Sequence, residues 1–192
     1  MDNVTVVPLK DQAADALRRE IYRGTLTDGM ELRQEDIAAQ LGISRIPVRE
    51  AMQQLQNEGL LIRLPNRHIK VVGARASRIR QSFAVLAAME CEIYTLAEPT
   101  LREKGLPELT TDWDFHLAIA ESLDNPAVSQ RFEIQRRMLL KALATLVDFT
   151  DEDLKPNNQA IVDAFNEGRD VVPYIRKYYN DLADKAAKEL DR

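Results

Sequence analysis

Residues 34–61 read QEDIAAQLGISRIPVREAMQQLQNEGLL, a pattern typical of two short helices joined by a tight turn. Apolar residues recur at helical spacing in both halves: Ile37, Ala38 and Leu41, then Val48, Met52 and Leu55. Gly42 favours a left-handed residue at the end of the first helix. Ser44 stands where the N-cap of the second helix is expected, with its hydroxyl accepting from a backbone N–H. The segment therefore predicts a helix-turn-helix.

The N-terminal end of the second helix carries residues outside its core face: Arg45, Ile46, Pro47 and Arg49. A helix with arginines in its outer first turns, packed across a short helix, fits the major groove of DNA. The alternative is an ordinary helical hairpin with two solvated arginines, because this geometry also occurs outside DNA-binding proteins.

A basic β-hairpin is predicted directly after the second helix. Residues 60–72, LLIRLPNRHIKVV, form two β-rich runs around Pro65 and Asn66. Its basic residues are Arg63, Arg67, His68 and Lys70. Such a wing makes a winged helix, whose tip can reach the DNA backbone or the minor groove. The wing favours the DNA-binding interpretation over the plain hairpin.

LGISRIPVREAMQQLQNEGLL, residues 41–61, resembles the signature of the GntR superfamily of bacterial transcription regulators. Two positions depart from the family pattern. Glu35 stands where many members have an arginine, so Arg33 is expected to contact phosphate instead, and His68 replaces the usual wing-tip glycine. The resemblance and the pattern together imply these DNA-contacting residues: Arg33, Ser44, Arg45, Ile46, Pro47, Arg49, Arg67, His68 and Lys70.

Composition indicates a globular protein. With 192 residues, 45% of them hydrophobic, the chain can bury the core of one domain or of two small ones. The sequence has no apolar run long enough for a membrane span, and its N-terminus MDNVTVVPLKDQ lacks the pattern of a signal peptide. The single Cys91 excludes an intramolecular disulfide and suits a reducing compartment. We expect a cytoplasmic protein without membrane contact.

The net charge of −5 is unevenly distributed along the chain. Residues 1–75 hold 11 Lys and Arg against 10 Asp and Glu, whereas the remainder holds 15 against 21. The first part is close to neutral, so one copy should bind DNA weakly. A homodimer that contacts two palindromic half-sites is therefore expected.

The rest of the chain predicts helices only. Residues 1–9 look extended, and a helix with Ala13, Leu17 and Ile21 on one face should end at Gly24. After the wing, helical patterns run over residues 79–98 until Pro99, over 112–123, from Pro126 to about Leu146, over 159–166 and from Pro173 to Leu190, with a loop at 151–156. The fold class is mainly α: a winged helix-turn-helix with a small β wing at residues 5–74, and an antiparallel bundle of about five helices at 75–192.

Asp112 and His116 are the residues of the bundle with the clearest chemistry. They are four residues apart, so both side chains can point to one spot on a helix, where they could hold a divalent metal. Alternatively, Asp112 simply favours the helix N-terminus and His116 pairs with it.

DWDFHLAIAESLDNP, residues 112–126, resembles the D-x-x-F-H motif of the FCD effector domain of FadR-like GntR regulators. That domain is a helical bundle, often with a metal held by an aspartate and three histidines beside an acidic metabolite. Asp112 and His116 match two of the ligands, but Asn158 and Asn180 stand where the other histidines are expected. Amide oxygens are poor replacements for imidazole, so a metal is possible but disfavoured. Leu86 replaces an expected arginine, and the segment between Glu98 and Thr111 is short for the family.

The resemblance implies an effector pocket at Asp112, His116, Asn158, Tyr178 and Asn180. An enzyme is disfavoured, because the sequence has no nucleophile placed near a histidine, no glycine-rich phosphate loop and no complete set of metal ligands. The expected function is that of a sequence-specific, metabolite-responsive transcription regulator. The resemblance implies that it acts as a repressor. The alternative is a helical adaptor whose winged helix binds protein.

Overall fold

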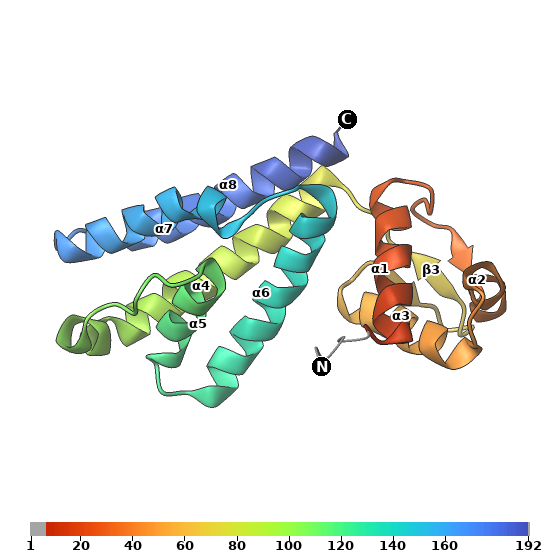
Figure 1. Ribbon diagram of the computed structural model, residues 1–192, viewed down its shortest axis with the longest axis horizontal. Coiled ribbons are helices and arrows are strands. Elements are labelled where there is room, and N and C mark those ends of the chain that lie inside the picture. Colours follow the sequence, from red (N-terminus) through yellow and green to blue (C-terminus); the bar gives the residue numbers. More distant parts are fainter. Residues whose placement is uncertain (1–6, 192) are drawn as a thin grey trace, which may run out of the picture. The chain divides into compact units, whose positions relative to one another are not determined.

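The N-terminal half of the chain folds around the predicted helix-turn-helix in the computed structural model, which describes residues 7–191 (Figure 1). Its elements are α1 (Leu9–Tyr22), β1 (Glu31–Leu32), α2 (Gln34–Leu41), α3 (Arg45–Asn57), β2 (Leu61–Arg63) and β3 (Ile69–Val71). The chain divides into two units, Met1–Arg75 and Ala76–Arg192, one residue beyond the predicted boundary. Of the segment expected to be extended, residues 1–9, the first six lie outside the described residues, as does the start of the predicted domain at residue 5, and Leu9 already belongs to α1.

The helix-turn-helix follows the predicted pattern except at its cap. Gly42 ends α2 with a φ of 66°, the left-handed conformation that its sequence position favours. Ser44 is the N-cap of α3, but its side chain makes no capping hydrogen bond, so that part of the prediction is wrong. Pro47 accounts for one of the two possible donors, since it occupies the third helical position and has no N–H to donate to the hydroxyl.

The wing is part of a three-stranded antiparallel sheet in the order β1-β3-β2. Leu61 to Arg63 pair with Ile69 to Val71 as the predicted hairpin, and Leu32 of β1 pairs with Ile69 on the other side. The two-residue strand β1 is too short to show an alternating pattern, so the sequence did not predict it. Side chains from α1, α3 and the sheet form one core that includes Leu17, Ile21, Val48, Met52, Leu55, Leu61 and Val71.

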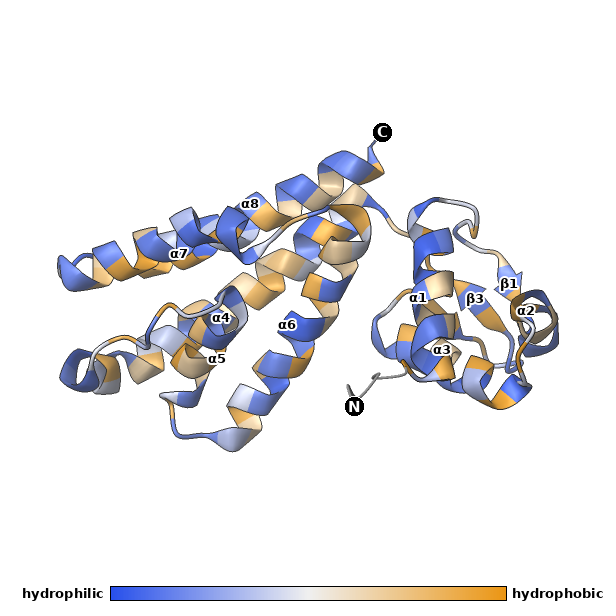
Figure 2. Cartoon of the chain, in the orientation of Figure 1, coloured by the Kyte–Doolittle hydropathy of each residue, from blue (hydrophilic) through white to orange (hydrophobic). Residues whose placement is uncertain are grey.

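The second unit is the predicted helical bundle. Its helices are α4 (Ala76–Lys104), α5 (Asp112–Glu121), α6 (Pro126–Leu146), α7 (Asp151–Asn166) and α8 (Val172–Leu190). In α4 and α8, Arg80 contacts Asp184 while Cys91 contacts Val172, so these two helices pack antiparallel. Each helix carries both hydrophobic and hydrophilic residues, as expected for amphipathic helices that bury one side (Figure 2).

Most helix starts in the bundle agree with their sequence signals. Thr111 caps α5, and its hydroxyl accepts from the Asp114 N–H at 3.0 Å. Pro126 opens α6, and Pro173 lies in the first turn of α8. Prolines are tolerated at these positions because the N–H groups of a first helical turn have no partner within the helix.

Two boundaries differ from the prediction. The helix predicted to stop at Pro99 continues to Lys104, because its last turn is held by tertiary contacts: Leu101 is buried and Arg102 donates to the Phe165 carbonyl oxygen at 2.6 Å. The predicted loop at residues 151–156 is the beginning of α7. Within residues 7–191, no helix is long and apolar enough to cross a membrane.

Candidate functional site

The end of α3 that was predicted to contact DNA belongs to a helix whose opposite face is packed into the core of the domain. Val48, Met52 and Leu55 are fully buried, whereas Ser44, Arg45, Ile46 and Arg49 are exposed and Pro47 is half-buried. Ile46 is 60% exposed, so a large apolar side chain lies at the surface beside the two arginines. A rigid helix therefore presents an apolar and cationic end to the surface.

The predicted wing residues form the tip of the hairpin. Arg67, His68 and the more remote Arg33 are exposed, and Lys70 is half-buried. The left-handed residue of the tip is Arg67, with a φ of 67°, rather than His68, where the family has its glycine. The N–H of Leu64 donates to the His68 carbonyl oxygen at 2.8 Å, which closes the turn. The basic side chains of the tip thus point away from the core on a well-defined hairpin.

Carboxylates contact some of these basic groups. Arg45 pairs with Glu35 at 2.7 Å, and His68 Nδ1 lies 2.6 Å from Glu31 Oε2. Glu35 was identified only as a departure from the family pattern, and its pairing with Arg45 was not foreseen from the sequence. Both pairs are solvent-exposed, so each is weak and can be exchanged for another partner.

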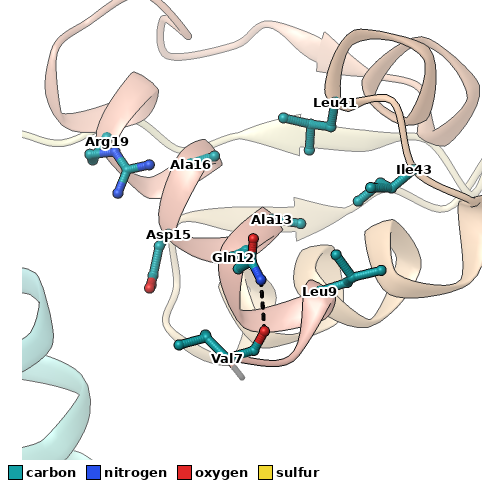
Figure 3. A pocket seen from close by; sticks show the side chains of 9 residues that line it. All are labelled: Val7, Leu9, Gln12, Ala13, Asp15, Ala16, Arg19, Leu41 and Ile43. Carbon is teal, nitrogen blue, oxygen red and sulfur yellow. Dashed lines mark hydrogen bonds between the residues drawn. The ribbon is translucent and has the colours of Figure 1, made fainter. Parts of the chain in front are cut away.

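A surface pocket of about 580 Å³ lies elsewhere in this domain, between the first half of α1 and the turn after α2 (Figure 3). Val7, Leu9, Leu41 and Ile43 supply apolar walls, and Gln12 donates to the Val7 carbonyl oxygen at 2.7 Å. None of the predicted DNA-contacting residues lines it.

The candidate effector site is a buried network to which all five helices of the bundle contribute. Its members are Glu90 from α4, Asp112 and His116 from α5, Arg136 from α6, Asn158 from α7, and Tyr178 and Tyr179 from α8. Each is less than 5% exposed. Asn180, the remaining predicted member, is exposed and takes no part, because the α8 face that points inward carries the two preceding tyrosines.

His116 and Asn158 form the first half of the network. His116 Nδ1 lies 2.5 Å from Glu90 Oε1, and its Nε2 lies 3.0 Å from Asn158 Oδ1. The Asn158 amide nitrogen donates to Asp112 Oδ1 at 2.8 Å, which leaves the amide oxygen to accept from His116. Both imidazole nitrogens are therefore occupied by protein groups.

Arg136 forms the second half and was missed by sequence reasoning. Its guanidinium donates to Asp112 Oδ2 at 2.5 Å, to the Tyr178 hydroxyl at 3.1 Å and to the Tyr179 hydroxyl at 3.0 Å. Burial opposes the charge, but Tyr179, Tyr178 and Asp112 more than compensate, so the pKa of Arg136 lies well above its ordinary value. An arginine in place of an apolar residue on the inner face of α6 was the available signal.

The two tyrosines complete the network as donors. Tyr178 donates to Asp112 Oδ1 at 2.8 Å, and Tyr179 donates to Glu90. Burial raises the pKa of both hydroxyls, so each keeps its proton. Tyr178 was expected as a candidate for an effector contact; here both hydroxyls are engaged with the protein itself.

These residues do not fit a divalent metal ion. The Asp112 carboxylate accepts from Arg136, Asn158 and Tyr178, and the guanidinium places a positive charge where the ion would be repelled. Among residues 7–191, no three His, Cys, Asp or Glu side chains are grouped so that they could hold a metal. The polar groups named above bond to one another, whereas the buried Nε of Arg136 has no hydrogen-bond partner.

Residues 9–71 match the family model of bacterial regulatory proteins, gntR family. The match is confined to the N-terminal domain and covers 63 of the 192 residues of the chain. The matched segment spans α1 to β3, so it includes both the exposed end of α3 and the wing.

Two similar proteins match about half of this chain. The chain is 34% identical over 89 residues to an HTH-type transcriptional regulator of Agrobacterium vitis, over 46% of this chain and 52% of that protein. It is 28% identical over 102 residues to the HTH-type transcriptional repressor RspR of Escherichia coli, over 53% of this chain and 45% of that one. The chain thus spans about half the length of these relatives.

A solved structure resembles the whole fold. It is described as Lar, which controls the expression of the Listeria monocytogenes agr system, and it has a TM-score of 0.55 at 16% sequence identity. The match covers 96% of this chain and 99% of that one. At this identity the likeness supports the architecture alone: a winged helix followed by a helical bundle.

Proposed function

We propose that this chain is a sequence-specific transcription regulator that binds duplex DNA through its gntR-type domain. The observation that carries the proposal is the exposed end of α3, where Arg45, Ile46 and Arg49 project from a helix whose other face is buried. A guanidinium in this position can bind guanine with two hydrogen bonds in the major groove. The relative RspR is described as a repressor, and we propose that DNA binding by this chain also represses transcription. The protein is proposed to act in the cytoplasm.

Selection from a pool of random-sequence duplexes tests this proposal. The expected product is a palindrome whose half-sites are about one helical turn apart, bound with an affinity that falls as salt is raised. Failure to enrich any sequence, with no salt-dependent shift of duplex DNA, would instead favour the adaptor that binds protein.

The helical unit is proposed to be a shortened FCD-like effector domain. In support, Asp112 and His116 of the motif on α5 lie side by side in the centre of the bundle with Asn158 and Tyr178. A small-molecule effector that binds there would have to exchange hydrogen bonds with the Arg136 guanidinium. Such binding could alter the placement of two winged helices in a dimer and so the half-site spacing that they match.

We expect this centre to work without a divalent metal, because Arg136 supplies the positive charge. Elemental analysis of protein purified without chelator should find well under one zinc or nickel per chain, and the unfolding temperature should not change with EDTA. One metal per chain that is lost in His116→Ala would contradict this expectation.

A homodimer is proposed as the functional form. Val85 on α4 is 71% exposed and Leu96 is 57% exposed, and they lie on one face of the helix three turns apart. A second copy is the proposed partner of this apolar face, which would supply two winged helices for a palindrome.

A further inference from the structure

Three carboxylates of one short segment, residues 28–35, pair with basic groups of the gntR-type domain. Arg75 contacts Asp28 at 2.5 Å, His68 contacts Glu31 at 2.6 Å, and Arg45 contacts Glu35 at 2.7 Å. Arg45 and His68 belong to the set expected to contact DNA. The basic groups come from α3, from the wing tip and from the end of the domain, so the pairs are not neighbours along the chain.

The pairs differ from ordinary surface ion pairs in where their basic partners come from. Many exposed pairs of this chain link residues two to five positions apart on one helix or turn, as Glu20 and Arg23 do on α1. By contrast, Glu35 lies on α2 and its partner on α3, while Glu31 lies on β1 and its partner at the wing tip. The carboxylates thus meet the same side chains that a DNA duplex would have to engage.

We propose that Glu31 and Glu35 are intramolecular competitors of DNA phosphate that lower the sequence-independent affinity of the gntR-type domain. This inference rests on the proposed DNA-binding function and adds that the two carboxylates lower the affinity for DNA of unrelated sequence. A carboxylate offers a guanidinium the same kind of charged oxygen acceptor as a phosphate. Binding of Arg45 or His68 to the DNA backbone therefore exchanges one anionic partner for another and gains little.

The charge of the domain fits this role. Residues 1–75 carry a net charge of only +1, from 11 Lys and Arg against 10 Asp and Glu, so attraction to the DNA backbone is weak before any pairing. Because Arg45 is paired with Glu35, its guanidinium must leave that carboxylate before it can contact DNA. The exchange is favourable chiefly where the edge of a base offers two hydrogen-bond acceptors. Contact with the sugar-phosphate backbone carries no sequence information, so suppressing it favours the reading of bases.

Glu35→Gln, Glu31→Gln and Glu20→Gln form a matched set for the test. All three remove one negative charge from the same domain by the same substitution, but the partner of Glu20 is Arg23, outside the expected DNA-binding set. The probes are a 30-bp duplex of scrambled sequence and the duplex selected by the wild-type chain from random sequences. Affinity for each is measured at several salt concentrations.

Glu35→Gln is expected to bind the scrambled duplex about two- to fivefold more tightly than Glu20→Gln, the range for one exposed ion pair. The slope of log affinity against log salt should become steeper by about one, since one more phosphate contact is made. Glu31→Gln should act in the same direction. Equal affinities and slopes for Glu35→Gln and Glu20→Gln would overturn the proposal.

A double variant tests whether Glu35 acts through its partner. In an Arg45→Ala background, adding Glu35→Gln should leave the affinity for the scrambled duplex at the level of Arg45→Ala with Glu20→Gln. If Glu35→Gln raises affinity as much without Arg45 as with it, the carboxylate acts by general repulsion and competition for Arg45 is refuted. If the wild-type chain binds neither duplex, the proposed function itself fails, which is a different result.

Discussion

Arg136 is the residue that most changes the interpretation of the helical unit. A buried charge is costly unless it is paired, and Arg136 is paired with Asp112 while it also contacts two tyrosine hydroxyls. The guanidinium thereby balances a carboxylate that would otherwise be buried without a cation beside it. It fixes the position of α6 against α5 and α8 by directional bonds, which apolar packing alone does not supply.

Replacing Arg136 by methionine should destabilise the helical unit by about 3–5 kcal/mol, because Asp112 is left buried without its partner. Urea unfolding followed by the fluorescence of Trp113, the single tryptophan, measures this in the domain concerned. Arg137→Met is the control, since its side chain is exposed, where it pairs with Glu133 and lies 5.8 Å from the centre of the Trp113 ring, and it should change stability by at most about 0.5 kcal/mol. Similar midpoints for the two variants would refute a central role for Arg136.

Arg49 provides the corresponding test at the end of α3 that is proposed to bind DNA. Arg49→Ala should weaken binding to the selected duplex by about 1–3 kcal/mol per half-site, the range for losing one guanidinium contact with a base. Electrophoretic mobility shift assays with selected and scrambled duplexes separate loss of base reading from loss of phosphate contact. Retention of wild-type affinity by both Arg49→Ala and Arg45→Ala would show that α3 does not enter the groove.

At the scale of elements, the start of α7 shows how a cap extends a helix through a proline. The Thr150 N–H donates to Asp153 Oδ2 at 2.8 Å, and the Thr150 hydroxyl donates to the same oxygen at 3.0 Å. Together with the three acidic residues of the first turn, these bonds favour a helix start at Asp151. Pro156 removes one backbone donor farther along, and α7 nevertheless continues to Asn166.

Thr150→Ala should destabilise the helical unit by about 0.5–2 kcal/mol, the usual loss for an N-cap side chain. Thr110→Ala, another exposed threonine that begins no helix, is the control and should have little effect. The Thr150 bonds also lower the pKa of Asp153, so its contribution is present above the ordinary aspartate pKa and is lost as pH falls through the lowered value. Unfolding midpoints of wild type and Thr150→Ala should therefore converge as the solution is acidified. A gap that is independent of pH would contradict the capping role of Asp153.

The oligomeric state decides whether one molecule presents one winged helix to DNA or two. Sedimentation at micromolar concentration should show a dimer, and Val85→Glu combined with Leu96→Glu should give a monomer, because charge would be placed on the exposed apolar face of α4. Ala84→Glu, on an exposed neighbour of Val85, should leave the dimer intact. A wild-type monomer with and without DNA would rule out the dimer.

Local signals were enough to predict the winged helix and most helix boundaries. Gly42, the Thr111 cap and Pro126 act on their own turn of backbone, so their effects can be inferred without knowledge of the rest of the chain. The amphipathic spacing of α1 and α3 likewise reveals which faces are buried, because a helix repeats its geometry at every turn. Fold class is therefore determined by the sequence alone.

Only the tertiary structure decided which polar side chains meet. The sequence suggests that Arg136 is solvated, but it is buried because Asp112, 24 residues earlier, and Tyr179, 43 residues later, accept hydrogen bonds from its two terminal nitrogens. Asn180 has the spacing of a site residue but points outward, since its α8 neighbours fill the centre. The pairing of Glu35 with Arg45 and the passage of α4 through Pro99 have the same cause. Contacts between distant residues outweigh local preference, and their geometry exists only in the folded chain.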